Sequence, residues 1–333
     1  MTSGNVIAAS TPVAKASKAV FVWGALGATF LVTQAYVYGS WILSPDFHAV
    51  PLGPDPVPDI ARISMKIYEI LSVVTLVTAV TWFVRGIQKT RAIDSTRLLM
   101  VGWLSANWLD PFLNFLSPMF TYNAVGFNRG CWCNFIPFWQ SANGAGYAEP
   151  LLVVPPAYFY TFTGTAIFGL MMMQKAKSRW PSIGNIGLCL AGFAGVWMTM
   201  GLLDIVATRY LGFDGWPGAF RNLSFWGGQS YQFPIYEAIL FPTPFVACAF
   251  LLFYADTDGR TAIERGLEHL VAPAWKLQMF RILAFVGFCN VLNLTYTTAM
   301  GIHAVYADPW PAIPSWLANG QCGGTTGIVC TKP

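Results

Sequence analysis

Residues 19–43 of this 333-residue chain read AVFVWGALGATFLVTQAYVYGSWIL, a run without a single Asp, Glu, Lys or Arg. A helix needs about 20 consecutive apolar residues to cross the hydrocarbon core of a bilayer, so this run is long enough for one crossing. Six further apolar runs follow it, at residues 63–84, 97–117, 150–173, 183–208, 233–254 and 279–303. The pattern predicts an all-α fold, a polytopic transmembrane helical bundle of about seven spans.

The overall composition agrees with a chain that uses lipid as its solvent. Hydrophobic residues make up 55% of the sequence, charged residues 10%, and the mean hydropathy is +0.51. Soluble domains carry about 25% charged residues, which this chain lacks. The formal net charge is only +4, which does not indicate a nucleic-acid-binding surface. The expected partners are the lipid bilayer and a lipophilic small molecule, whereas the oligomeric state is left open.

The basic residues indicate the orientation. Most of the 19 Lys and Arg residues fall in alternate connections, such as the one holding Lys175, Lys177 and Arg179. The positive-inside rule places these connections in the cytoplasm. We therefore expect residues 1–18 to be a disordered cytoplasmic N-terminus, residues 19–306 the membrane domain, and residues 307–333 an external tail. In an external tail, Cys322 and Cys330 could form a disulfide or stay free thiols.

Several carboxylic acids interrupt the apolar runs. Glu69, Asp110, Asp204 and Glu237 lie inside predicted spans, and Glu149 lies at the start of the fourth. From the helix rise, the first four lie about 7–10 Å below the outer ends of their helices. Ionisable groups at such a depth are costly and usually mark a functional cavity, although each could instead form a structural hydrogen bond between helices.

Amides accompany the acids at the same level. Asn107, Asp110 and Asn114 have the spacing i, i+3, i+7, which places them on one face of an α-helix. Asn290 and Asn293 begin the same spacing on the last span. We infer a polar pocket with aromatic walls inside the bundle. A desolvated carboxyl group there can hold a proton near neutral pH and donate it.

Common catalytic signatures are missing from the sequence. It has no H-E-x-x-H, no G-x-S-x-G, no Walker A motif and no G-x-G-x-x-G. The three histidines, His48, His269 and His303, fall in different segments on different sides of the predicted membrane. Lys276 lies at the inner end of the last span, too shallow for a retinal-type lysine. We therefore predict no metal site and no cofactor.

Four segments carry a family resemblance. They are Trp108 to Asn114 (WLDPFLN), Phe120 to Ala124 (FTYNA), Asn128 to Gly130 with Trp132, and Gly228 to Pro234 (GQSYQFP). They resemble the AveC-like spirocyclase family, from about the first span to the seventh, and D-P-x-x-N is the most specific element. The resemblance implies a multi-pass protein of the bacterial plasma membrane, typical of actinomycetes and secondary metabolism. The named member forms and modifies a spiroketal.

The leading hypothesis is a membrane cyclase that closes a ring on, or dehydrates, a lipophilic polyketide or terpenoid by acid–base chemistry. Asp110 and Asp204 would be proton donor and acceptor in either order. The acids expected to tune them are Glu69, Glu149 and Glu237. The residues expected to bind or orient substrate are Asn107, Asn114, Tyr122, Asn123, Arg129, Trp132, Gln232, Asn290, Asn293 and Tyr296. The alternative is a non-enzymatic binder or transporter of a lipid or sterol.

Overall fold

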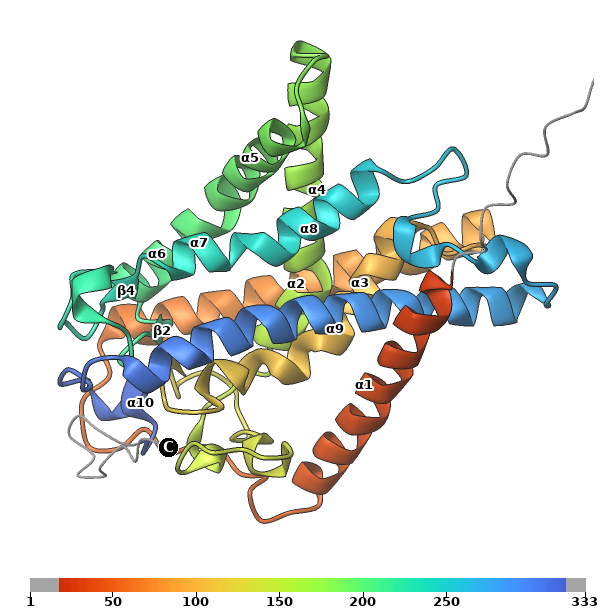
Figure 1. Cartoon of the computed structure of the whole chain (residues 1–333). Helices are drawn as coiled ribbons and strands as arrows, with labels where there is room; N and C mark the ends of the chain where they lie inside the picture. Colours follow the sequence, from red (N-terminus) through yellow and green to blue (C-terminus); the bar gives the residue numbers. More distant parts are fainter. Residues whose placement is uncertain (1–17, 322–333) are drawn as a thin grey trace, which may run out of the picture.

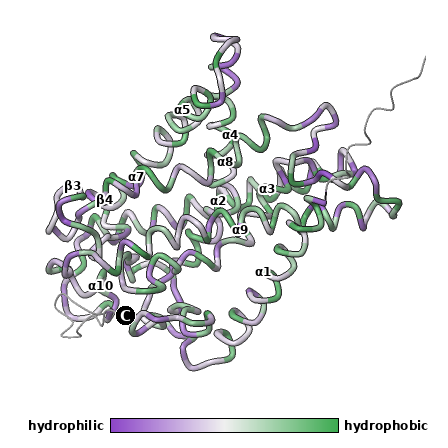
Figure 2. The backbone as a smooth tube through the Cα atoms, in the orientation of Figure 1, coloured by the Kyte–Doolittle hydropathy of each residue, from purple (hydrophilic) through white to green (hydrophobic). Residues whose placement is uncertain are grey.

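The computed structural model describes residues 18–321 and is mostly helical (Figure 1). The longer helices are α1 (Ala19–Ile42), α2 (Asp59–Thr90), α3 (Ser95–Ala106), α4 (Val154–Arg179), α5 (Asn185–Val196), α8 (Pro242–Phe253) and α9 (Ala274–Tyr306). Shorter ones are α6 (Leu202–Val206), α7 (Glu237–Leu240) and α10 (Ser315–Ala318). A helix or helical segment therefore lies in each of the seven predicted runs. Figure 2 shows hydrophobic positions along the helices and hydrophilic ones gathered in the connections.

Four helical stretches are long and apolar enough to cross a membrane. In the described part of the chain these are Ala19–Ile42, Asp59–Thr90, Asn185–Leu211 and Ala274–Tyr306. Residues 185–211 form one continuous stretch because a π-helical turn at Trp197–Gly201 joins α5 to α6, and a second one at Ala207–Leu211 extends α6. The mostly helical class and the presence of apolar membrane-length helices are thus confirmed.

The third predicted span differs from the expectation of one α-helix over residues 97–117. Helix α3 ends at Ala106 and continues as a 3-10 helix, Asn107–Asn114. Pro111 explains the change, because its nitrogen carries no hydrogen for the carbonyl four residues earlier. The run 233–254 also starts irregularly, in strand β4 (Phe233–Pro234), before α7 and α8.

Helix α9 runs through the middle of the molecule and packs against α1, α3 and α8 (Figure 1). The crossing with α1 depends on glycine. A Cβ atom on Gly27 would lie 2.0 Å from the carbonyl oxygen of Leu283, and one on Gly287 would lie 2.2 Å from that of Trp23. The two backbones can approach this closely only because neither position has a side chain, which is a common way for membrane helices to associate.

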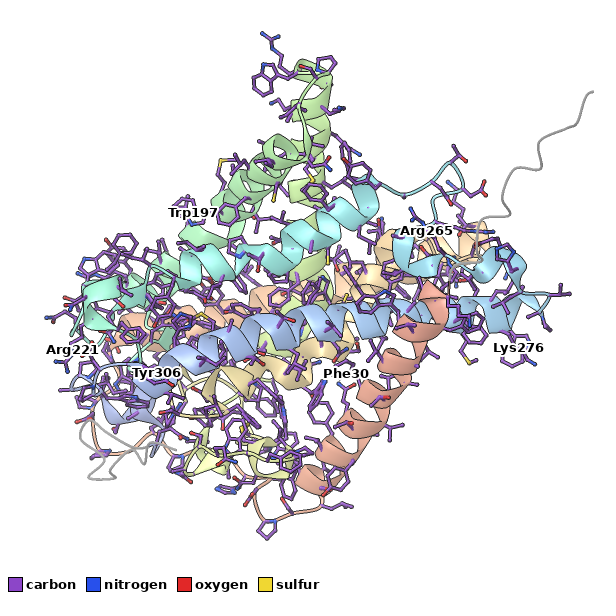
Figure 3. All side chains as sticks on the ribbon, in the orientation of Figure 1. Phe30, Trp197, Arg221, Arg265, Lys276 and Tyr306 are labelled. Carbon is purple, nitrogen blue, oxygen red and sulfur yellow. A yellow bond between two sulfur atoms is a disulfide. The ribbon has the colours of Figure 1, made fainter. Side chains whose placement is uncertain are left out.

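Two small antiparallel pairs organise the long connections at the end of the bundle where Arg221 and Tyr306 lie. Arg265 and Lys276 lie toward the other end (Figure 3). Strand β1 (Thr121–Tyr122) pairs with β2 (Asp214–Gly215), so that Tyr122 lies opposite Asp214. Strand β3 (Ser224–Phe225) pairs with β4. The pairing of β1 and β2 brings together two connections that are far apart in the sequence.

Residues 307–321, the described part of the segment after α9, are packed against the rest of the protein. The amide of Ala124 donates to the carbonyl of Trp316, and Asn319 donates to the carbonyl of Tyr122. Trp316 and Leu317 are buried. Residues 307–321 therefore pack over the β1 connection. Cys322, Cys330 and residues 1–17 lie outside the described part of the chain.

Candidate functional site

Asp110 is held in the 3-10 helix that follows α3. In such a helix, residues i and i+3 lie on one face, so Asn107 and Asp110 share a side but Asn114 does not. The predicted common face of all three residues is wrong for this reason. Asn107 instead accepts a hydrogen bond from the phenol of Tyr38, and the side chain of Asn114 accepts from the amides of Met119 and Phe120 at 2.8 Å each.

The carboxylate of Asp110 accepts hydrogen bonds from two phenols. Tyr122 donates to Oδ2 at 3.0 Å, and Tyr158 of α4 donates to Oδ1 at 3.0 Å. Asn293 of α9 donates in turn to the Tyr158 oxygen at 3.2 Å and to the carbonyl of Ala106 at 3.0 Å. The two phenols and the amide fix the carboxyl group of Asp110 from three separate parts of the chain.

Glu149 lies against Asp110 from the end of the connection that precedes α4. Its side chain is 2% exposed. Burial raises the pKa of Glu149 well above its usual range. The charge of Asp110 and a hydrogen bond with Asp110 raise it further. Two carboxyl groups at such close range cannot both carry a charge without a large cost, so the pair holds a proton. A proton held between two buried acids is available for transfer to a bound substrate.

Three more acids lie across from this pair. Asp204 comes from α6, between the two π-helical turns, and lies close enough to Asp214 for their charges to interact. Glu237 stands at the start of α7 and accepts a hydrogen bond of 2.6 Å from the phenol of Tyr296. Its other oxygen, Oε2, is buried and has no hydrogen-bond partner among the described residues. That oxygen is free to bind a substrate atom.

Asp214 reaches the same place through strand β2. Its carboxyl group accepts a hydrogen bond from the hydroxyl of Thr208. Burial raises the pKa of Asp214 to about 7, although the Thr208 hydrogen bond opposes the shift. Asp214 therefore keeps its proton to a higher pH than an ordinary aspartate does.

A cavity of about 140 Å³ separates the two groups of acids. Its polar lining consists of Asp110, Tyr122, Tyr158, Asp204, Asp214, Glu237, Tyr296 and Thr297. Its apolar lining consists of Leu113, Phe120, Val153, Val154, Ala157, Phe162, Met200, Phe213, Trp216 and Phe241. None of these lining residues is Lys, Arg or His. The walls thus combine carboxyl groups and phenols with aromatic rings, and aromatic faces stabilise nearby positive charge.

The structure brings only part of the predicted set together. The members that line the cavity are Asp110, Tyr122, Asp204, Glu237 and Tyr296. Glu149 and Asn293 do not line it, but Glu149 interacts with Asp110 and Asn293 donates to Tyr158. Glu69 does not reach it. Its carboxylate is paired with Lys66 at 2.7 Å and accepts a hydrogen bond from the amide of Phe127. Glu69 therefore anchors the long connection to α2.

The remaining predicted residues contact neighbouring segments and do not line the cavity. Asn123 binds the carbonyl of Gly212 at 2.8 Å, and Gln232 binds the carbonyl of Trp216 at 2.9 Å. The indole of Trp132 donates to the carbonyl of Trp108 at 2.8 Å, and the indole of Trp108 donates to Asn290 at 2.9 Å. The guanidinium of Arg129 lies 5.3 Å from the ring centre of Phe127. These contacts fix the connections and helices to one another.

Sequence reasoning missed Asp214 and Tyr158. Asp214 lies outside the predicted spans, in a connection rich in Gly and Trp, and its pairing with Tyr122 places it at the cavity. Tyr158 is one aromatic among many in an apolar run. The structure also joins Cys131 and Cys133 in a disulfide within the long connection.

Comparison with known proteins supports the resemblance. The family model for AveC-like spirocyclases matches residues 90–317, which is more than half of the chain. The chain belongs to the AveC-like spirocyclase family. The match begins at the end of α2, so α1 and most of α2 precede it, whereas the resemblance was expected from about the first span. No curated protein and no solved structure matched the chain.

Proposed function

We propose that this member of the AveC-like spirocyclase family is a membrane-embedded cyclase that acts by acid–base chemistry on a lipophilic polyketide or terpenoid. The observation that carries the proposal is the Asp110 carboxyl group. It is fixed by Tyr122 and Tyr158 and paired with Glu149, and it faces a second group of acids across an aromatic-walled cavity. Such a site can deliver a proton on one side of a substrate and remove one on the other.

The proposed reaction is ring closure through an oxygen-stabilised cation. An acid on one wall protonates a carbonyl oxygen, a hydroxyl of the same substrate adds to the carbonyl carbon, and this hydroxyl gives its proton back to a carboxylate of the site, which leaves a neutral hemiketal. Protonation and loss of its hydroxyl as water leaves an oxocarbenium ion. A second hydroxyl then adds, and an acid on the other wall takes up its proton. One water leaves for each spiroketal formed, and the site ends with as many protons as it began.

Asp110 and Asp204 are the proposed donor and acceptor, in either order, and Glu149 and Glu237 support them. General acid–base steps of this kind contribute about 10² to 10⁴-fold in rate. The aromatic rings Phe120, Phe162 and Trp216 would stabilise the cation. Because the lining holds no basic side chain, the cavity favours a neutral substrate that gains positive charge during the reaction.

We further propose that the membrane domain crosses the bilayer seven times in the plasma membrane of a bacterium. The N-terminus would lie in the cytoplasm and the C-terminus outside. Support comes from the helical segments in all seven predicted runs and from the uneven distribution of basic residues among the connections.

Metabolite profiling of a deletion strain against its complemented parent tests the enzymatic function. Accumulation of one uncyclised or hydrated precursor in the deletion strain, reversed by wild type but not by Asp110→Asn, is the expected result. Unchanged precursor pools with an altered distribution across the membrane would replace the cyclase with a binder or transporter.

A further inference from the structure

A second concave surface lies away from the acid cavity, at the C-terminal part of α2. It encloses about 520 Å³ and is lined by Val77, Thr78, Thr81, Trp82, Arg85, Gly86, Lys89 and Arg97. Its apolar part consists of α2 side chains that face outward, among them Val77 at 61% and Trp82 at 49% exposure. Its other part is basic. The groove therefore combines an apolar surface, which suits an acyl chain, with positive charge.

Arg97 is held in a fixed position on the wall of this groove. It is buried, its guanidinium lies 3.9 Å from the ring centre of Trp82, and it donates to the carbonyls of Trp82 and Phe83 at 3.2 and 3.1 Å. A Cβ atom on Gly86 would lie 1.7 Å from Nη2 of Arg97. The absence of a side chain at Gly86 is what lets the guanidinium lie across α2.

Two further cations in the groove have no acidic partner. Arg85 and Lys89 are one helical turn apart on α2, both are exposed, and neither forms an ion pair within the described chain. The nearby carboxylate of Asp94 is paired with Arg97. Lys89 also offsets the negative end of the α2 dipole, since it stands in the last turn. The groove thus keeps an excess of positive charge at the end of a membrane-length helix.

We propose that this groove binds an anionic glycerophospholipid. Its phosphate would lie between Arg85 and Lys89, and one acyl chain would follow Val77 and Trp82. A phospholipid fits better than a free phosphate because the basic end continues directly into an exposed apolar surface. Basic pockets between membrane helices bind anionic headgroups, and each such cation adds about a fivefold preference. The site is independent of the acid cavity.

Native mass spectrometry of the purified full chain tests the site. The protein is released from vesicles of equal parts phosphatidylglycerol and phosphatidylcholine with the same acyl chains. We expect wild type to retain one phosphatidylglycerol in preference to phosphatidylcholine. The double variant Arg85→Gln, Lys89→Gln should lower that ratio by about tenfold or more. Lys175→Gln with Lys177→Gln, which removes two cations from the end of α4, is the matched control and should leave the ratio unchanged.

A third variant separates a groove from general surface charge. Val77→Trp fills the apolar part and keeps every cation, so retained phosphatidylglycerol should fall. An equal loss in the α4 control, an unchanged ratio in the α2 variant, or full retention by Val77→Trp would each overturn the proposal. Displacement of the lipid by millimolar inorganic phosphate would also overturn it and indicate a free-phosphate site. All four proteins should elute as the same species, because the substituted side chains are exposed.

Discussion

The phenol of Tyr158 donates a 3.0 Å hydrogen bond to Oδ1 of Asp110 and thereby ties α4 to the 3-10 helix that follows α3. Asn293 donates to the same phenol oxygen from α9. One carboxyl group is therefore oriented by helices from distant parts of the chain. Its position follows from packing between elements, and each contact can be removed singly.

Asp110→Asn keeps the shape of the side chain and one acceptor oxygen but removes the titrating proton. We expect normal expression and membrane insertion, with product formation reduced by about 10²-fold or more, because an amide cannot serve as a general acid or base. Product is measured in membranes supplied with the accumulated precursor. Asp258→Asn, in an exposed connection, should keep wild-type turnover. Near-normal turnover by Asp110→Asn would remove Asp110 from the mechanism and shift the assignment to Asp204.

Tyr158→Phe removes only the hydroxyl group that orients Asp110. A hydrogen bond to a charged group contributes about 1.5–3 kcal/mol, so turnover should fall by roughly tenfold or more while the protein stays folded. Tyr160→Phe is the matched control, since this neighbour on α4 donates to Ser72 at 2.9 Å. Equal losses in the two variants would show that α4 packing, and not the Asp110 contact, is responsible.

Asp214 predicts a pH dependence of stability. Its folded-state pKa of about 7 exceeds the value of about 3.9 for an unfolded chain, so the folded protein binds more protons between these limits. The stability contributed by Asp214 is fully present below about pH 4 and is lost progressively as the pH rises to about 7 and above.

The Asp214→Asn variant removes this titration. Melting temperatures of the detergent-solubilised protein, measured from about pH 5 to pH 8, should therefore fall less steeply with pH for the variant than for wild type. Asp308→Asn, on the surface near Arg221, should keep the wild-type slope. Parallel slopes for wild type and Asp214→Asn would contradict a raised Asp214 pKa.

The orientation of the chain is open to a direct test. A reporter fused after Pro333 should read external, whereas one inserted near Ser178 should read cytoplasmic. Three predicted spans separate the two positions, so they must lie on opposite sides. Both reporters on the same side would disprove the seven-span arrangement.

Gly27 and Gly39 lie on the same helix but differ in surroundings. Gly27→Ala should destabilise the protein by about 1–3 kcal/mol, because the new methyl group would meet the Leu283 carbonyl. Gly39→Ala meets no atom within 4 Å and should be neutral or slightly stabilising, since alanine favours a helix. Thermal melting in detergent distinguishes them. Equal melting temperatures would mean that α1 and α9 do not cross at Gly27.

The sequence by itself determined where the helices form and which acids are unusual. Apolar run length depends on local composition alone, and α1 (Ala19–Ile42) ends within one residue of the predicted run 19–43. Asp110, Asp204 and Glu237 stood out for a similarly local reason, because a carboxyl group within an apolar run is conspicuous without any knowledge of its neighbours.

Only the tertiary structure decided which acids meet. Glu69 looked equivalent to Asp110 in sequence, yet Lys66 and the Phe127 amide satisfy it away from the cavity. Asp214 looked like a loop residue, yet the pairing of β1 with β2 brings it opposite Tyr122. The type of helix decided which side chains share a face, because a side chain points in a different direction in a 3-10 turn than in an α-helical turn. A carboxyl group's depth follows from its own helix, but its partners come from elements that are distant in the chain.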